Sequence, residues 1–334
     1  MSEKNFRYTD ILSTDFRVSP TLQAKDLDMA TEAHRLLRGR GGVEIAGVSH
    51  SEEDYAYGRI VTIKILNEEG AQQMGRDPGN YITIEARGLI KAVDDSMLDE
   101  ISLTLAKTLQ KLLPDEAERQ KKPVLLTGLG NFHTLADAIG PKVISYIQPT
   151  NHFFRPELAD ELLPVAAFAP GVVGNTGIET ADLIKGAADA IDPCCIIVID
   201  ALAAGSLGNL LSSFQLCDTG IRPGSGVQNH RRAINKDYLG KPVIAIGIPT
   251  VVNASSVIRE SVISSLQELA SERTELIDSI TEHLLMPFAG NLVVTPKEAD
   301  TLIPLSAKII AAGLTRALHP GADQATFRHY MQEV

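Results

Sequence analysis

Two aspartates, Asp137 and Asp200, are the residues of this chain whose positions most clearly suggest chemistry. Asp200 directly follows the apolar run 196–199, and Asp137 comes shortly after the apolar run 124–127 and the glycine-rich loop 128–131. Such runs are typical of buried strands, and ligands of open parallel sheets bind beyond the carboxyl ends of the strands. Two carboxyl groups brought to that edge could share protons and activate a water molecule.

Each aspartate also has a structural explanation. Asp137 lies near the start of a predicted helix, where the helix dipole favours an acid, so its position alone supports either role equally. Asp200 ends an all-apolar strand. That is a poor place for a core residue and a good one for a site at the sheet edge, so the position of Asp200 favours a functional role.

Apolar strands alternating with helices predict a parallel sheet that helices cover on both faces. The predicted strands of this part are 124–127, 165–169, 196–199 and 243–248, with helices at 137–147 and 178–191. Upstream we expect a helix at 27–38, strands at 60–65 and 81–85, and a helix at 97–113. After residue 253 the pattern predicts a mainly helical chain through about residue 318.

Two helix starts carry capping signals. Thr176 and Glu179 have the spacing of a capping box, which is the role we expect for Glu179, although the backbone donors of this glycine-rich loop could also line the cleft. Before the last helix, Thr295 is the expected N-cap residue and Glu298 the expected N3 residue.

Other motifs that could bind a cofactor or metal are incomplete. The loop 128–131 lies where a dinucleotide-binding fingerprint would lie, but His133 replaces the third glycine, so its glycines are expected to let the backbone turn sharply at a cleft. His133, His152, His230 and the two aspartates are candidate metal ligands. No His-x-x-x-His or Cys-x-x-Cys pair exists, which argues against a dedicated zinc site.

Composition narrows the class of protein. The chain has 334 residues, with 31 Lys and Arg against 42 Asp and Glu and a net charge of −11, which argues against a nucleic-acid binder. No apolar run reaches membrane-spanning length, so we expect no membrane partner. The N-terminus lacks the apolar core of a secretory signal, and the three cysteines are expected to be reduced thiols in a cytoplasmic protein.

Several segments together resemble one family, the spore germination proteases. Matching segments occur over most of the chain: Gly79-Asn80-Tyr81-Ile82-Thr83-Ile84-Glu85, Gly128-Leu129-Gly130-Asn131, Asp137-Ala138-Ile139-Gly140-Pro141, Thr176-Gly177-Ile178-Glu179-Thr180, Ile199-Asp200-Ala201-Leu202-Ala203, Asp218-Thr219-Gly220-Ile221-Arg222-Pro223-Gly224-Ser225-Gly226-Val227, and Asn291-Leu292-Val293-Val294-Thr295-Pro296-Lys297-Glu298. Each piece alone is short, and it is their combination that is specific.

The resemblance implies a fold and an activity. The fold is an α/β three-layer sandwich with a mostly parallel central sheet, similar to hydrogenase maturation endopeptidases, with a small β-containing N-terminal subregion and a helical C-terminal segment. The activity is that of an endopeptidase that degrades small acid-soluble spore proteins during germination. The resemblance also implies a homotetramer, which we expect in the cytoplasm of the spore core. From the motifs we expect no cofactor and no metal site.

The resemblance further assigns residues. Asp137 and Asp200 match the two proposed catalytic aspartates of the family, and Gly130, Asn131, Thr176 and Glu179 belong to its active-site loops. A propeptide of residues 1–10 would be removed by a cut between Asp10 and Ile11, which leaves residues 11–334 as a single peptidase domain.

This sequence departs from the family pattern near both aspartates. Leu135-Ala136 replaces a Thr-Pro pair before Asp137, and the segment 204–208 lacks an arginine that the family carries. Two further hypotheses therefore stay open. One is a metal-dependent peptidase that uses the two aspartates as ligands with His133 as a third, and the other is a non-catalytic paralogue that binds spore proteins.

Overall fold

The computed structural model describes residues 24–39, 44–86, 88–89, 94–158, 160, 162–222, 231–266, 281, 292–319 and 321–322. The expected propeptide 1–10, with Asp10 and Ile11, lies outside the described residues, and so does His230. Of the helical course expected after residue 253, the structure describes α10 (Ala254–Leu266) and α12 (Ala299–Leu318).

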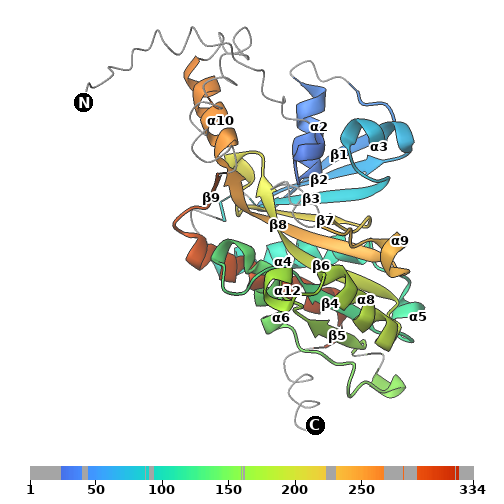
Figure 1. Cartoon of the computed structure of the whole chain (residues 1–334). Helices are drawn as coiled ribbons and strands as arrows, with labels where there is room; N and C mark the ends of the chain where they lie inside the picture. Colours follow the sequence, from blue (N-terminus) through green and yellow to red (C-terminus); the bar gives the residue numbers. More distant parts are fainter. Residues whose placement is uncertain are drawn as a thin grey trace.

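The described strands form one mixed sheet of nine strands (Figure 1). Its order is β1-β2-β3-β7-β8-β6-β4-β5, with β9 paired to β8. The strands are β1 (Val48–Tyr55), β2 (Gly58–Ile65), β3 (Gly79–Ala86), β4 (Val124–Gly128), β5 (Val165–Phe168), β6 (Cys195–Ala204), β7 (Ser213–Cys217), β8 (Val243–Asn253) and β9 (Val293–Val294).

The parallel part of the sheet consists of β5, β4, β6 and β8, the four strands predicted from their apolar runs. The other pairings, from β8 through β7 and β3 to β1, are antiparallel. The β-containing N-terminal subregion therefore continues the central sheet. Its strand β3 pairs with β7, with Ile84 opposite Phe214.

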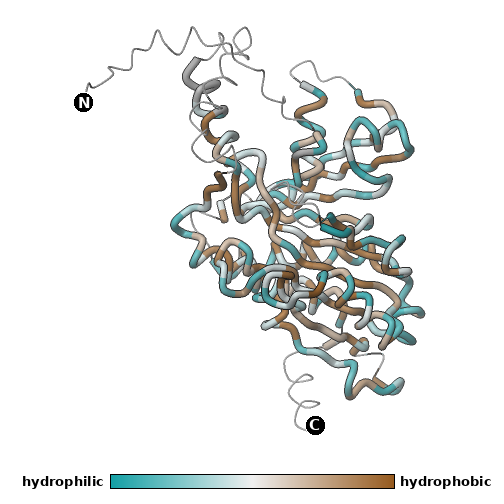
Figure 2. Tube along the Cα trace, viewed as in Figure 1, coloured by the Kyte–Doolittle hydropathy of each residue, from teal (hydrophilic) through white to brown (hydrophobic). Residues whose placement is uncertain are grey.

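Helices cover both faces, so the predicted α/β sandwich is confirmed. On one face, α4 (Asp95–Gln110), α6 (Ile139–Tyr146) and α12 pack on a cluster that includes Ile197 and Ile199. On the other face, α2 (Ala30–Arg38) and α8 (Thr180–Ile191) pack on a cluster that includes Ile196 and Val198. Figure 2 shows hydrophobic stretches running through the central strands between these layers.

The remaining helices are short. They are α3 (Glu68–Met74), α5 (Glu116–Arg119), α7 (Val173–Thr176), α9 (Lys236–Leu239) and the 3-10 turns η1 (Ala24–Asp26), η2 (Leu135–Asp137), η3 (Pro156–Leu158) and η4 (Leu207–Asn209). All three cysteines are free and buried, as expected for reduced thiols.

The last helix, α12, corrects two expectations. It is long and apolar enough to cross a membrane by length and composition, contrary to the expectation from apolar runs, but it packs in the core against α4 and α6. Its N-cap position holds Glu298, whose side chain makes no capping bond. The expected N-cap residue Thr295 instead donates a hydrogen bond of 2.9 Å to the carbonyl oxygen of Thr250, because β9 ties this segment to the sheet.

Candidate active site

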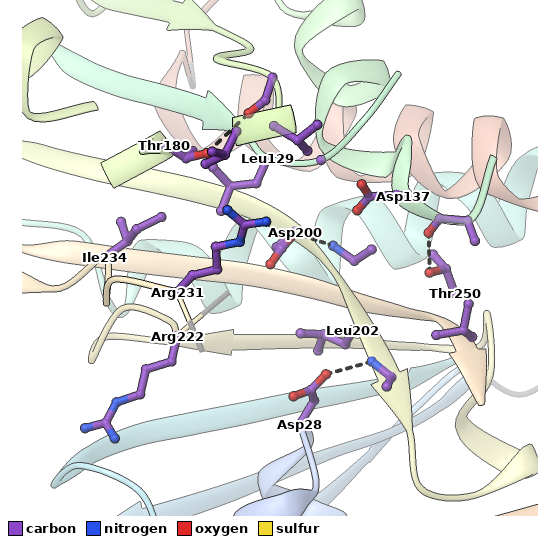
Figure 3. A pocket seen from close by; sticks show the side chains of 18 of the residues that line it. Asp28, Leu129, Asp137, Thr180, Asp200, Leu202, Arg222, Arg231, Ile234 and Thr250 are labelled. Atoms are coloured by element: carbon purple, nitrogen blue, oxygen red, sulfur yellow. Dashed lines mark hydrogen bonds between the residues drawn. The ribbon is translucent and has the colours of Figure 1, made fainter. Parts of the chain in front are cut away.

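A cavity of about 370 Å³ opens beyond the carboxyl end of β4 and along the carboxyl-terminal halves of β6 and β8 (Figure 3). Its wall is formed by segments far apart in the sequence: Asp28, Leu129, Gly130, Ala136, Asp137, 171–173, 179–181, 200–203, Arg222, Arg231, Arg232, Ile234, Thr250, Val251 and Val293. Both predicted aspartates line it. The cavity therefore lies where the predicted strands end, but Asp200 lies within β6 and not at its end as predicted, because β6 continues beyond the apolar run 196–199.

Asp200 reaches this cavity because β6 continues past its neighbour. The pairing of β4 with β6 ends where Gly128 lies opposite Ile199, one residue before Asp200. Since side chains alternate along a strand, Asp200 lies on the same face as Ile196 and Val198, beneath α2 and α8. Its Oδ1 accepts a hydrogen bond of 2.9 Å from the amide of Ala201.

The surroundings of Asp200 favour a neutral carboxyl group. Burial raises the pKa of Asp200 well above its usual range, and the nearby carboxylates of Asp137 and Asp28 raise it further. The hydrogen bond from Ala201 opposes this change only in part. Of the two acids, Asp200 is therefore the one expected to hold its proton to higher pH.

Asp137 lies at the end of the turn η2, just before α6. Its Oδ2 accepts a hydrogen bond of 2.8 Å from the amide of Asn131. Burial raises the pKa of Asp137, while the hydrogen bond from Asn131 lowers it. Of the two acids Asp137 is therefore the better candidate for the ionised form.

Two glycines bring the Asp137 loop against β6. Gly130 has a φ of +109°, and a Cβ atom there would lie 2.0 Å from the carbonyl oxygen of Asp137. A Cβ atom on Gly140 would lie 2.2 Å from the carbonyl oxygen of Leu129 and 2.6 Å from that of Ile199. Only glycine allows α6 and the loop to approach the backbone of β6 this closely.

Thr250 supports the same loop from β8. Its buried hydroxyl group donates to the carbonyl oxygen of Ala136, the residue before Asp137. Thr250 also accepts at its own carbonyl oxygen from Thr295. The position of Asp137 thus depends on a chain of hydrogen bonds that reaches β8 and the segment after β9.

The predicted loop residues fall in different places. Gly130 and Glu179 line the cavity, and Asn131 acts through its amide on Asp137. Thr176 is exposed and is not part of the cavity wall. The expected capping box is not formed, because the Thr176 hydroxyl accepts from Ile178 and Glu179 instead pairs with Arg231 at 3.9 Å.

The residues needed for the metal hypothesis do not come together. His133 is exposed, packs edge-on against the ring of Phe132 and does not line the cavity. Over the described ranges, no group of three or more His, Cys, Asp or Glu side chains is arranged to hold a metal ion. Two carboxyl groups with unequal proton affinity suit acid–base chemistry on a water molecule instead.

Several cavity residues were not among the predicted site residues, although Arg222 lies in one of the segments that match the family. Arg222, Arg231 and Arg232 give the wall a cationic side, although the chain as a whole is acidic. Asp28 and Thr250 also reach the cavity. Asp28 lies inside the predicted helix 27–38, which begins only at Ala30 in the structure, and Thr250 lies just beyond the predicted strand 243–248, so neither stands out before the fold brings them to the cavity.

Comparisons with known proteins identify the family. The family model described as "Germination protease" matches residues 21–278 and 262–331. Among solved structures, the chain is similar to the [NiFe] hydrogenase maturation protease HycI from Thermococcus kodakarensis, with a TM-score of 0.29 and 15% identity, covering 58% of this chain and 97% of that one.

Curated relatives cover nearly the whole chain. A germination protease from Caldanaerobacter subterraneus subsp. tengcongensis is 42% identical over 315 residues, which span 89% of this chain and 95% of the relative. One from Clostridium perfringens is 38% identical over 313 residues, spanning 88% and 94%. The chain therefore belongs to the germination protease family and is a peptidase of spore germination.

Proposed function

We propose that this peptidase cleaves small acid-soluble spore proteins with Asp137 and Asp200 as an acid–base pair. The observation that carries the mechanism is that both carboxyl groups line one cavity and both have raised pKa values, Asp200 far more than Asp137. Membership of the germination protease family supports the proposed substrate class.

In the first step, the ionised Asp137 takes a proton from a water molecule while the water oxygen attacks the scissile carbonyl carbon. The protonated Asp200 donates its proton to the carbonyl oxygen, and a tetrahedral diol results. In the second step, Asp137 passes its proton to the leaving nitrogen and Asp200 recovers its own as the carbonyl re-forms. Atoms and charges balance, and both aspartates return to their starting forms.

The assembly and location carried over from the family belong to this proposal. We place the enzyme in the cytoplasm of the spore core as a homotetramer, made as a precursor that loses residues 1–10. Sedimentation of the purified chain and mass spectrometry of its mature N-terminus test these two points. A monomer, or a mature form that keeps Asp10, would count against them.

Cleavage of a purified small acid-soluble spore protein is the central test. The full-length chain and the chain lacking residues 1–10 are assayed in parallel by mass spectrometry of the products. Asp137→Asn and Asp200→Asn should each abolish cleavage, because each removes one proton-transfer group. Asp189→Asn is the matched control, since Asp189 is exposed and pairs with Lys185 on the surface of α8.

The outcomes separate the competing hypotheses. Full activity of either active-site variant would refute the acid–base pair. Binding of the spore protein without cleavage by the unmodified chain would favour a binding paralogue. Loss of cleavage after exhaustive chelation, restored by added divalent metal, would favour the metal-dependent peptidase.

A further inference from the structure

One side of β6 lacks a strand partner next to Asp200. The pairing with β4 stops at Ile199, whose carbonyl oxygen accepts from the amide of Leu129 at 2.8 Å, while β6 itself continues to Ala204. Beyond Ile199, the backbone amides of β6 on the edge that faced β4 therefore have no strand partner. Unpaired amides at such an edge need other acceptors.

Carboxyl groups occupy this edge in a row. Asp200 itself accepts from the amide of Ala201 at 2.9 Å. Asp28 Oδ2 accepts from the amide of Ala203 at 2.8 Å, and Glu32 Oε2 accepts from the amide of Gly205 at 2.7 Å. The segment that precedes and begins α2 thus takes the place of the missing strand and supplies side-chain acceptors in place of carbonyl groups.

The backbone around Asp28 is itself held firmly. Gln215 of β7 accepts from the amide of Ala30 at 2.7 Å and donates to the carbonyl oxygen of Asp28 at 3.2 Å. The guanidinium group of Arg76 donates to the carbonyl oxygen of Leu27. Asp28 is therefore fixed from both sides, and its carboxylate can in turn fix the end of β6.

Asp28 also faces the reacting pair. It lines the same cavity as Asp137 and Asp200, and in Figure 3 its carboxylate points toward the end of β6. Burial is the main cause of the raised pKa of Asp200, the charge of Asp137 from η2 adds to it, and the charge of Asp28 adds a smaller part. The charged groups Glu179, Arg222, Arg231 and Arg232 line the cavity as well.

We propose that Asp28 is a positioning residue of the peptidase, whose carboxylate bonds the amide of Ala203 and so holds the end of β6 with Asp200 in the cavity beside Asp137. Its negative charge also adds, after burial and the charge of Asp137, to the rise in the pKa of Asp200. This inference rests on the proposed acid–base pair. In this proposal Asp137 and Asp200 transfer the protons, and Asp28 only positions Asp200 and influences its pKa.

Two substitutions separate the hydrogen bond from the charge. Asp28→Asn keeps an oxygen that can accept from Ala203 and removes the charge. In the pH dependence of activity, we expect kcat at acidic pH to stay within about threefold of the unmodified enzyme. The fall of kcat/KM at alkaline pH should move to lower pH, because Asp200 loses its proton more easily without the charge of Asp28. Asp28→Ala removes both functions, and we expect kcat to fall by about tenfold or more with little change in KM.

The matched control is Glu32→Gln. Glu32 belongs to the same segment and bonds the amide just beyond the end of β6, but it does not line the cavity. We expect this variant to melt at a lower temperature and to keep the alkaline limb of the unmodified enzyme. A shift of the alkaline limb of kcat/KM in Asp28→Asn but not in Glu32→Gln would show that the effect comes from the charge near Asp200. It would not then come from a loss of order in the segment that precedes and begins α2.

A measurement without turnover completes the test. The carboxyl carbon of Asp200 is followed by carbon-13 NMR as pH is raised, with its signal assigned through Asp200→Asn. In Asp28→Asn, Asp200 should lose its proton at lower pH than in the unmodified enzyme. An unchanged titration would overturn the inference whether or not Asp28→Ala folds.

The two proposals fail in different ways. If Asp200→Asn is inactive but both Asp28 variants keep the normal kcat and pH profile, Asp28 has no positioning role and the acid–base pair stands. If Asp200→Asn stays active, the acid–base pair is wrong, and the NMR titration alone decides whether Asp28 controls the protonation of Asp200.

Discussion

Asp200→Asn should make the enzyme inactive and at the same time more stable at neutral and alkaline pH. In the folded chain burial raises the pKa of Asp200 well above the ordinary value of 3.8 near which this carboxyl group ionises in the unfolded chain. Above that value the folded state binds one more proton than the unfolded state, so stability falls as pH rises until the folded pKa is reached. An asparagine, which does not ionise, removes this loss.

The magnitude follows from the linkage of one proton. Each pH unit between the unfolded and folded pKa values of Asp200 costs the unmodified protein about 1.4 kcal/mol, so two units cost about 2.7 kcal/mol. The side-chain oxygen of the introduced asparagine can still accept from the amide of Ala201, so that hydrogen bond is retained. The variant should therefore gain stability relative to the unmodified chain as pH increases.

Urea unfolding at several pH values between about 5 and 8 measures the effect. Protein concentration is kept constant so that assembly contributes equally at each pH. The difference in unfolding free energy between Asp200→Asn and the unmodified chain should rise with pH, whereas that for the surface control Asp189→Asn should stay flat. A flat or falling difference for Asp200→Asn would refute the claim that folded Asp200 carries a proton.

Three further predictions concern positions that support the site and the core. Thr250→Val removes the donor to the carbonyl of Ala136 and should cost about 1–3 kcal/mol in urea unfolding and lower kcat, because the Asp137 loop loses its support; unchanged kcat would contradict this role. Gly140→Ala forces a Cβ atom against the Leu129 carbonyl and should destabilise the fold by about 1–3 kcal/mol or more, seen as a lower melting temperature. Burial lowers the pKa of His319 to about 4, so the unfolded chain binds the extra proton and stability should fall as pH drops from 6.5 toward 4. The variant His319→Gln should lack this part of the acid sensitivity in unfolding measured at each pH.

The parallel part of the sheet could be predicted because its signal is local. Its central strands contain runs of apolar residues buried on both faces, such as 196–199, and the polar residue that follows such a run is expected near the sheet edge. Asp200 and Asp137 could therefore be placed at one sheet edge before any contact was known. The strand β1 was not predicted, because it is an edge strand with mostly exposed polar residues and little hydrophobic alternation.

Other parts of the site could not be predicted because they depend on distant pairings. Thr295 has the local signature of an N-cap, but the pairing of β9 with β8 gives its hydroxyl group a partner in Thr250. Asp28 acquires its role only because β4 is shorter than β6 and leaves an amide of β6 to be bonded. Neither the length mismatch nor the pairing has a signal in the residues concerned.

The pairing of β3 with β7 also sets the order in which the enzyme can be assembled during its synthesis. The antiparallel strands β1, β2 and β3 are synthesised early, but Ile84 of β3 pairs with Phe214 of β7. One edge of β3 therefore stays unpaired until β7 has emerged from the ribosome. The Asp137 loop waits longer still, since its support through Thr250 is completed only by Thr295. A nascent chain therefore cannot complete the support of the Asp137 loop until Thr295 has been translated.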